Sequence, residues 1–180
     1  MTDTTSAHLR GASERDDLVA MLDKHRGLFL LTTQGLTEEQ ARLTPTVSAL
    51  SVGGLVKHVT ATEQQWLDFL EHGAPDADDV DWDNPDEAAY EDFANGFRLL
   101  PEETLAGVLA DYETVAARAA DLARTADLDT THPLPEAPWF EKGARWSNRR
   151  VLLHIVTETA QHAGHADIIR ETIDGQRSMG

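Results

Sequence analysis

The sequence has no cysteine and no long apolar run. The absence of cysteine among its 180 residues excludes disulfide bonds, thiolate metal sites and cysteine nucleophiles. No apolar stretch approaches the roughly 20 residues that a membrane-spanning helix needs. The first residues, Met1 to Thr5, also lack the basic and then apolar pattern of a secretory signal. We therefore expect a cytoplasmic protein with no membrane partner.

Positive charge is also scarce. The chain has 15 lysines and arginines against 32 aspartates and glutamates, which gives a formal net charge of −17. Such a charge repels phosphate backbones, so we expect no nucleic-acid partner. Hydrophobic residues at 41% and charged residues at 26% are typical of a globular protein. The length suits a single domain over residues 1–180, with a core from about residue 14 to residue 175.

Apolar residues recur mostly at three- and four-residue steps in four segments, which predicts an all-α fold. The predicted main helices cover residues 14–34, 51–70, 101–126 and 147–173. Ser51 and Ser147 are expected N-caps, Pro101 is a suitable first-turn residue, and Gly175 follows the last helix. A capping box at Thr37 predicts a short helical turn. These features favour an antiparallel four-helix bundle with two long connections, which argue against a simple up-down-up-down order.

The two long connections differ in composition. Residues 71–92 contain ten acidic residues, and we interpret them as a solvated loop because no spacing matches an EF-hand cation loop. Residues 127–147 contain three prolines together with Trp139, Phe140 and Trp146. Loops of this length without secondary structure are uncommon. This second connection is either a lid or a packed crossover that covers the end of the bundle.

Histidine and glutamate form a stripe on the last predicted helix. His154, Glu158, His162 and His165 follow one another at spacings of four, four and three, which places them within about 80° of one helix face. Glu158 and His162, one turn apart, can converge on one ion held between helices. His58 lies inside the second predicted helix. The alternative is a polar stripe that faces solvent.

These residue types suit a divalent cation. Neutral imidazole nitrogens together with one carboxylate can hold Zn²⁺, Fe²⁺ or Ni²⁺. Ionisable side chains on an apolar helix face are costly to bury unless they are paired or bind a metal. We expect the remaining histidines to lie at the surface or in loops, and they are His8, His25, His72 and His132.

Two segments resemble the signature helices of the DinB-like four-helix bundle superfamily. They are LSVGGLVKHVTATEQQWL (50–67) and WSNRRVLLHIVTETAQHAGHADIIRETIDG (146–175). Within this superfamily, the two segments resemble an actinobacterial subgroup of uncharacterised proteins. This subgroup is related to the N-terminal domains of mycothiol-dependent maleylpyruvate isomerases. The order of helices matches from about residue 14 to residue 175. The resemblance implies a dimeric four-helix bundle.

The resemblance also implies a set of metal ligands. The first metal histidine of the superfamily falls on His58, and the paired ligands fall on Glu158 and His162. The resulting His/Glu/His set matches the zinc site of the isomerase branch, so zinc is the expected ion, with nickel and iron as alternatives. His165 stands where many relatives carry glutamine; a fourth ligand and a proton shuttle are possible roles, and we favour a hydrogen-bonding partner of a ligand. His154 is expected to be a structural histidine.

Related bundles resemble thiol S-transferases, in which the metal activates a low-molecular-weight thiol such as mycothiol or bacillithiol. Three protein ligands leave an open position on the ion, where a thiol can bind. The resemblance therefore implies a metal-dependent thiol S-transferase or isomerase that acts on a small electrophile. Two alternatives stay open at this point. One is metal-dependent hydrolysis, and the other is a non-catalytic, dimeric, stress-associated or binding protein with a structural or vestigial metal site.

Overall fold

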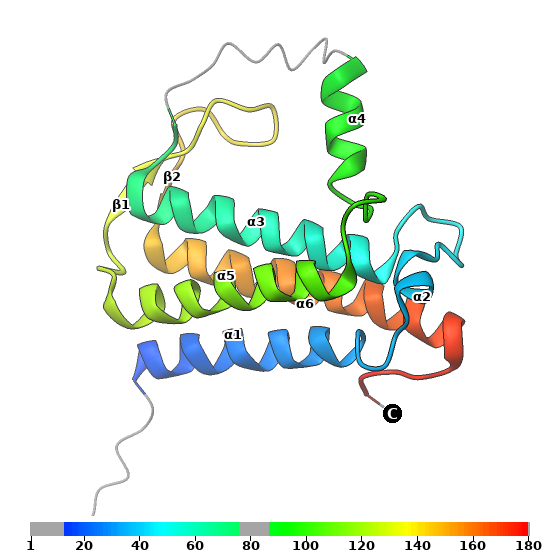
Figure 1. The fold of residues 1–180 in the computed structure, drawn as a ribbon. Helices are drawn as coiled ribbons and strands as arrows, with labels where there is room; N and C mark the ends of the chain where they lie inside the picture. Colours follow the sequence, from blue (N-terminus) through cyan, green and yellow to red (C-terminus); the bar gives the residue numbers. More distant parts are fainter. Residues whose placement is uncertain (1–12, 76–86, 180) are drawn as a thin grey trace, which may run out of the picture.

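The structure is a computed structural model, and it describes residues 13–75 and 87–179. In this part of the chain, long helices form an elongated bundle (Figure 1). The elements are α1 (Glu14–Leu31), α2 (Glu38–Arg42), α3 (Val52–His72), α4 (Glu87–Asn95), α5 (Leu105–Thr125), β1 (Thr131–Pro133), β2 (Arg145–Ser147) and α6 (Asn148–Asp174). Among the described residues, no helix is both long enough and apolar enough to cross a membrane. The all-α prediction is confirmed, with one short hairpin added.

The predicted helix ends are set by the expected caps. Ser51 and Ser147 accept hydrogen bonds from the backbone N–H groups of the turns that follow them. Thr37 forms the expected capping box at the start of α2. Gly175 ends α6 in the left-handed conformation, with φ of 78°, which is accessible to glycine at little cost. Local sequence therefore fixes where these helices begin and end.

The third predicted helix starts later than the sequence suggested. Pro101 lies in a turn, and α5 begins only at Leu105. The reason is Thr104, whose side chain accepts a hydrogen bond from the backbone N–H of Gly107 and so acts as the N-cap. Glu38 of α2 also accepts a hydrogen bond from the backbone N–H of Leu105. A side-chain cap and a neighbouring helix outweigh the preference of proline for a first turn.

Helices α1 and α6 pack side by side and run in the same direction. Near their N-termini, Arg149 of α6 pairs with Glu14 of α1. Near their C-termini, the Arg170 guanidinium donates hydrogen bonds to the carbonyl oxygens of Thr32 and Gln34. Contacts at matching ends of two helices require a parallel arrangement.

Helices α3 and α5 are also parallel neighbours. Lys57 lies 2.7 Å from Glu103 where both helices begin, and Arg118 donates a hydrogen bond to Glu71 where both end. The chain therefore returns along the bundle between His72, where α3 ends, and Leu105, where α5 begins. This long crossover confirms the expectation that the bundle does not follow a simple up-down-up-down order.

The acidic connection, predicted to be a loop over residues 71–92, is partly helical. Helix α3 continues to His72, and residues 87–92 belong to α4, which projects away from the bundle (Figure 1). Ala88 and Ala89 are good helix formers, and they favour a helix despite the acidic residues that predicted a loop. Acidic side chains also stabilise the first turn of a helix. The remaining part, residues 76–86, lies outside the described residues.

The second connection is a packed hairpin at its base. Strands β1 and β2 pair antiparallel, with His132 opposite Trp146. No sequence pattern predicted these strands. Trp146 is 9% exposed and stacks on Trp66 of α3, with ring centroids 4.8 Å apart. Phe140 packs against the ring of Trp146. The crossover interpretation therefore holds for Phe140 and Trp146, whereas Trp139 is exposed.

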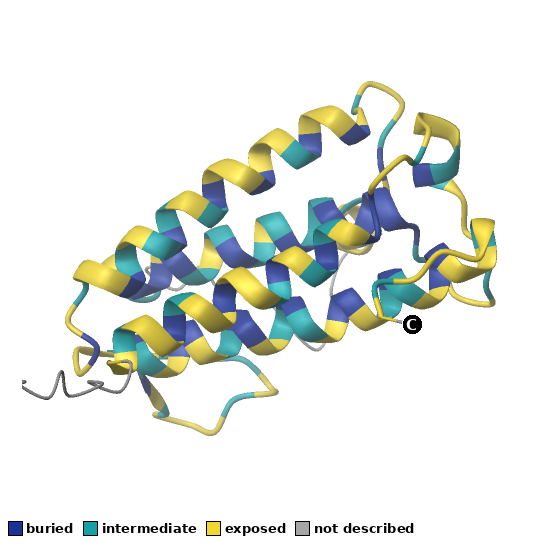
Figure 2. Ribbon diagram, turned by 90° about the horizontal axis from the view of Figure 1, so that it is seen from below, coloured by how far each residue is buried: buried dark blue, intermediate teal, exposed yellow. Residues whose placement is uncertain are grey.

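Two apolar clusters form the core, and the inner faces of the helices are buried (Figure 2). One cluster surrounds Leu67 near the hairpin, and the other surrounds Phe29 near α2. Charged and polar side chains lie between them along the helices. Arg26 of α1 and Glu63 of α3 form a buried ion pair there, with side chains 7% and 1% exposed. The bundle thus has a polar layer near its middle.

Candidate metal site

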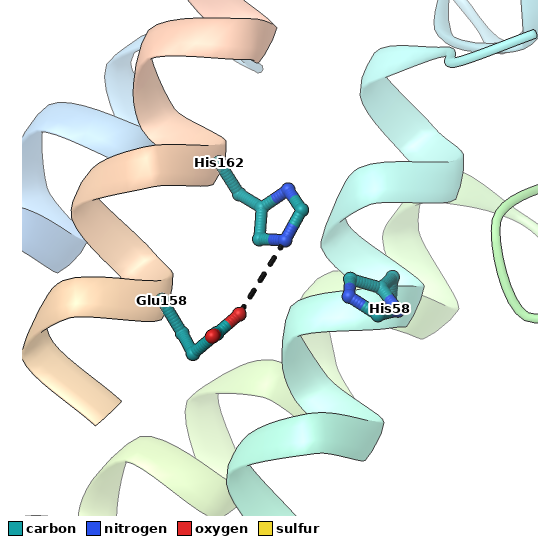
Figure 3. Close-up of side chains that lie close together, drawn as sticks. All are labelled: His58, Glu158 and His162. Atoms are coloured by element: carbon teal, nitrogen blue, oxygen red, sulfur yellow. Dashed lines mark ion pairs between the residues drawn. The ribbon is translucent and has the colours of Figure 1, made fainter. Parts of the chain in front are cut away.

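Helices α3 and α6 bring three of the predicted ligands together (Figure 3). His58 projects from α3, and Glu158 and His162 project from consecutive turns of α6. One ligand atom from each residue lies within 4.8 Å of the other two. The helical spacing of four explains why Glu158 and His162 point the same way. The antiparallel packing of α3 against α6 adds His58 from the other side.

The distances suit a small divalent ion. The Nε2 atom of His162 lies 3.6 Å from the Oε2 atom of Glu158. Two ligands of a tetrahedral zinc ion, each about 2.1 Å from the metal, are roughly 3.4 Å apart. His162 is buried and the other two side chains are half-buried. The atoms of Glu158 and His162 therefore have nearly the spacing of two ligands of one ion, and a ring nitrogen of His58 lies within 4.8 Å of both.

The electrostatics favour neutral imidazoles. Burial lowers the pKa of His58 to about 4, and the nearby His162 adds to the effect because two positive rings repel each other. Burial likewise lowers the pKa of His162, although Glu158 acts in the opposite direction. A neutral imidazole offers the lone pair that a metal needs. Both histidines are thus held in the metal-binding form near neutral pH.

Phe97 covers one face of His58. The two rings stack with centroids 3.9 Å apart and an angle of 21° between their planes. This contact depends on Gly54 in the first turn of α3, where a Cβ atom would lie 2.6 Å from the carbonyl carbon of Phe97 and would overlap its oxygen. Only glycine allows the backbone of residue 97 to approach so closely. The glycine therefore holds an aromatic wall beside the candidate ligand.

His154 has a closer relation to the site than the sequence suggested. Its Nε2 atom lies 3.5 Å from the Oε1 atom of Glu158. Its ring packs edge-on against Trp66 and Trp146, at 4.8 Å and 5.0 Å between centroids. Burial lowers its pKa, and the charge of Glu158 partly offsets that effect. His154 thus has the structural role expected of it, and it also contacts the carboxylate of Glu158. Its position four residues before Glu158 was the sequence feature that could have indicated this contact.

His165 does not join the group of three. Its ring centroid is 5.5 Å from that of His162, and its buried Nδ1 atom has no hydrogen-bond partner among the described residues. Of the other histidines, His72 is exposed, while His132 lies in β1 and contacts the carbonyl oxygen of Leu70 at 3.1 Å. His8 lies outside the described residues.

Side chains from α3 and α6 pack between the candidate site and the polar layer and leave no room for a water molecule. They are Val59, Thr62, Glu63, Ile155, Glu158 and Thr159. Burial raises the pKa of Glu63, and the charge of Arg26 opposes that effect. Neither Arg26 nor Glu63 was predicted from the sequence, because a single charged residue in a helical pattern does not reveal its partner.

Three protein ligands leave at least one position on a divalent ion for another molecule. Such an arrangement is typical of catalytic metal sites, since an open position can bind water or a substrate atom. Structural sites are normally closed by four protein ligands. The geometry is therefore compatible with metal-assisted chemistry on a small molecule.

Comparisons with known proteins agree with this architecture. The crystal structure of a conserved protein of a locus from Enterococcus faecalis superposes with a TM-score of 0.64, at 15% identity, over 92% of this chain and 100% of that chain; it shows the shared fold. A search of curated proteins finds no match. The sequence model of the mycothiol-S-transferase family matches residues 17–175. The chain therefore belongs to the mycothiol-S-transferase family, within the DinB-like superfamily of four-helix bundles.

Proposed function

We propose that the protein is a divalent-metal-dependent S-transferase that joins a low-molecular-weight thiol, mycothiol, to a small electrophile. The observation that supports this proposal most directly is the convergence of His58, Glu158 and His162, whose ligand atoms lie within 4.8 Å of one another. The family match supplies the thiol. The chain has no cysteine, so the reacting sulfur must come from a cosubstrate.

In this proposal His58, Glu158 and His162 hold the ion, and zinc is the favoured metal. When bound, such an ion makes a coordinated thiol more acidic and so makes its sulfur a better nucleophile near neutral pH. Nickel and iron remain alternatives, because a donor set of two histidines and one carboxylate accepts several first-row metals.

The surrounding residues prepare these ligands. Burial keeps His58 and His162 neutral, so little proton loss is needed before they bind a metal. His154 contacts one oxygen of Glu158 and thereby orients the other oxygen toward His162. Phe97 stacks on His58 and excludes water from one face of that ring.

Elemental analysis of protein purified without a His-tag tests the metal site. We expect about one equivalent of zinc, nickel or iron per chain, as for a single three-ligand site, and almost none in His162→Ala. The matched control is His72→Ala, which removes an exposed histidine and should retain the metal. Absence of metal from the parent, even after incubation with Zn²⁺, would make the polar stripe a structural feature.

A second measurement separates the possible activities. Mycothiol-dependent consumption of an electrophile, in proportion to the metal content, is the expected result. Turnover without thiol would favour metal-dependent hydrolysis. Metal binding without any turnover would favour a non-catalytic binding protein. A homodimer, a single domain and a cytoplasmic location stay predictions; sedimentation analysis tests the first of them.

A further inference from the structure

Helix α4 exposes two aromatic side chains beside the candidate site. Tyr90 and Phe93 are 64% and 69% exposed, and their spacing of three residues places them on the same helix face. Figure 1 shows α4 projecting away from the four long helices rather than lying along them. Packing of the bundle core therefore does not account for these two rings.

Ring contacts connect this exposed face to the candidate ligands. Phe93 meets Phe97 with centroids 5.2 Å apart and an angle of 61° between planes. Phe97 in turn stacks on His58, with centroids 3.9 Å apart. Gly54 fixes the position of Phe97, since its lack of a side chain admits the backbone there. An apolar wall thus extends from the candidate metal ligand to the exposed side of α4.

We propose that Tyr90, Phe93 and Phe97 form the subsite for the apolar, aromatic part of the electrophile. This inference rests on the proposed S-transferase function. Because Phe97 stacks on His58 and contacts Phe93, an electrophile held beside His58 would have this wall within reach. Aromatic side chains bind planar apolar groups well, because ring faces and edges attract one another and because contact removes apolar surface from water.

Charge narrows the class of electrophile further. Glu91 and Asp92 are exposed on the same helix, and the whole chain has a formal net charge of −17. Anionic substrates are repelled by such a surface. The subsite therefore fits a neutral or cationic electrophile that carries a planar aromatic group.

The reaction is an ordinary displacement. The sulfur of mycothiol attacks the electrophilic carbon, and a carbon–sulfur bond forms as the bond to a halide breaks. The halide leaves with the bonding electron pair, and the thiol proton passes to solvent. No oxidant or reductant is needed.

Two alkylating agents test the subsite in the metal-loaded protein. Monobromobimane carries a planar, conjugated bicyclic group, whereas iodoacetamide carries none. For the double variant Tyr90→Ser/Phe93→Ser we expect kcat/KM with monobromobimane to fall by about tenfold, as for the loss of partly buried aromatic contacts. The value with iodoacetamide should stay within about twofold. Ile168→Ser, which removes a 62% exposed apolar residue from α6, is the matched control and should change neither value.

A binding measurement gives an independent readout. The fluorescent bimane adduct of mycothiol should bind the double variant about tenfold more weakly than the parent, with unchanged metal content. Equal losses with both alkylating agents, no loss with either, or no binding of the adduct to the parent would overturn the proposal. A dimeric parent that becomes monomeric in the double variant would also overturn it, since the face would then bind a second copy of the chain. If the parent transfers mycothiol to neither agent, the proposed function fails, while the affinities for the adduct still test the subsite.

Discussion

His58 and His162 face each other from antiparallel helices, with ring centroids 4.8 Å apart and an angle of 73° between their planes. At this distance the protonation of one ring opposes the protonation of the other. Burial acts in the same direction on both rings. The pKa of each imidazole therefore lies below its ordinary value, and His58 is neutral at a pH where free histidine is largely charged.

Metal binding should consequently release few protons. The pKa of His58 is about 4, so at pH 6 this residue has no proton to lose, whereas a histidine with the ordinary pKa of 6.5 would release roughly three quarters of a proton. His162 has a lowered pKa too. Calorimetric titration of the metal-free protein with Zn²⁺, in buffers of different ionisation enthalpy, measures the number released. We expect well under one proton at pH 6.

Release of one proton or more at pH 6, falling toward zero at pH 8, would mean that the two histidines titrate normally. Burial would then not lower the pKa of either histidine in the metal-free protein. Affinity for Zn²⁺ would also fall between pH 7.5 and pH 6, whereas neutral ligands predict little change over this interval.

Gly54 and Gly164 should respond oppositely to the same substitution. A Cβ at Gly54 meets the backbone of Phe97, whereas a Cβ at Gly164 meets nothing within 4 Å. Gly54→Ala is expected to destabilise the fold by about 1–3 kcal/mol through overpacking. Gly164→Ala is expected to stabilise it by about 0.5–1 kcal/mol, because alanine is a better helix former. Urea unfolding of both variants measures the difference.

The same pair of variants tests the aromatic wall. Gly54→Ala must push Phe97 away from His58, so it should also weaken metal binding, whereas Gly164→Ala should not. Equal stability of the two variants would show that residues 96–100 do not pack on α3 as closely as the structure has them.

The buried pair of Arg26 and Glu63 predicts strong non-additivity. Both side chains are almost inaccessible to solvent, so removal of one leaves the other charge buried without its partner. Arg26→Met and Glu63→Leu should each cost about 3–5 kcal/mol of unfolding free energy. The double variant should recover most of that loss, because apolar residues often replace a buried ion pair at no cost.

Urea unfolding of the two single variants and the double variant gives the coupling free energy directly. Glu14→Ala, which removes a partner of Arg149 at the exposed end of α1, serves as a control and should change the urea midpoint little. If the single losses simply add in the double variant, the two charges do not stabilise each other in the core.

Local signals predicted the helices and two of the candidate ligands. Ser51 and Ser147 cap helices because a serine oxygen satisfies nearby backbone donors whatever the rest of the fold. Glu158 and His162 face the same way because of the four-residue spacing alone. The position of His58 opposite them depends on how α3 packs against α6, and the family resemblance supplied that relation.

Contacts between distant segments could not be predicted in this way. Nothing near residue 97 indicates that Phe97 stacks on His58, since 39 positions separate them in the sequence. Strand β2 has only three residues, and its pairing with β1 depends on the packing of Trp146 against α3. The partner of Glu63 is likewise on another helix. Such relations arise from tertiary packing, which local periodicity does not encode.

His154 gives the sharpest test of the surroundings of the metal site. It touches Glu158 through Nε2, while its ring fills the space beside Trp66 and Trp146. His154→Phe keeps the aromatic packing and removes the nitrogen. The loss of a partner that orients a ligand typically weakens metal affinity by about 10- to 100-fold, and we expect a decrease in that range.

The control for this variant is His132→Phe in β1. It removes the ring nitrogen that contacts the carbonyl oxygen of Leu70 in α3, away from the three candidate ligands. Competition with a zinc-sensitive dye measures both affinities, and urea unfolding establishes that both variants are folded. An unchanged affinity in His154→Phe would mean that Glu158 holds its orientation without this contact. A decrease in His154→Phe alone would show that the aromatic cluster at the hairpin supports the metal site through one nitrogen atom.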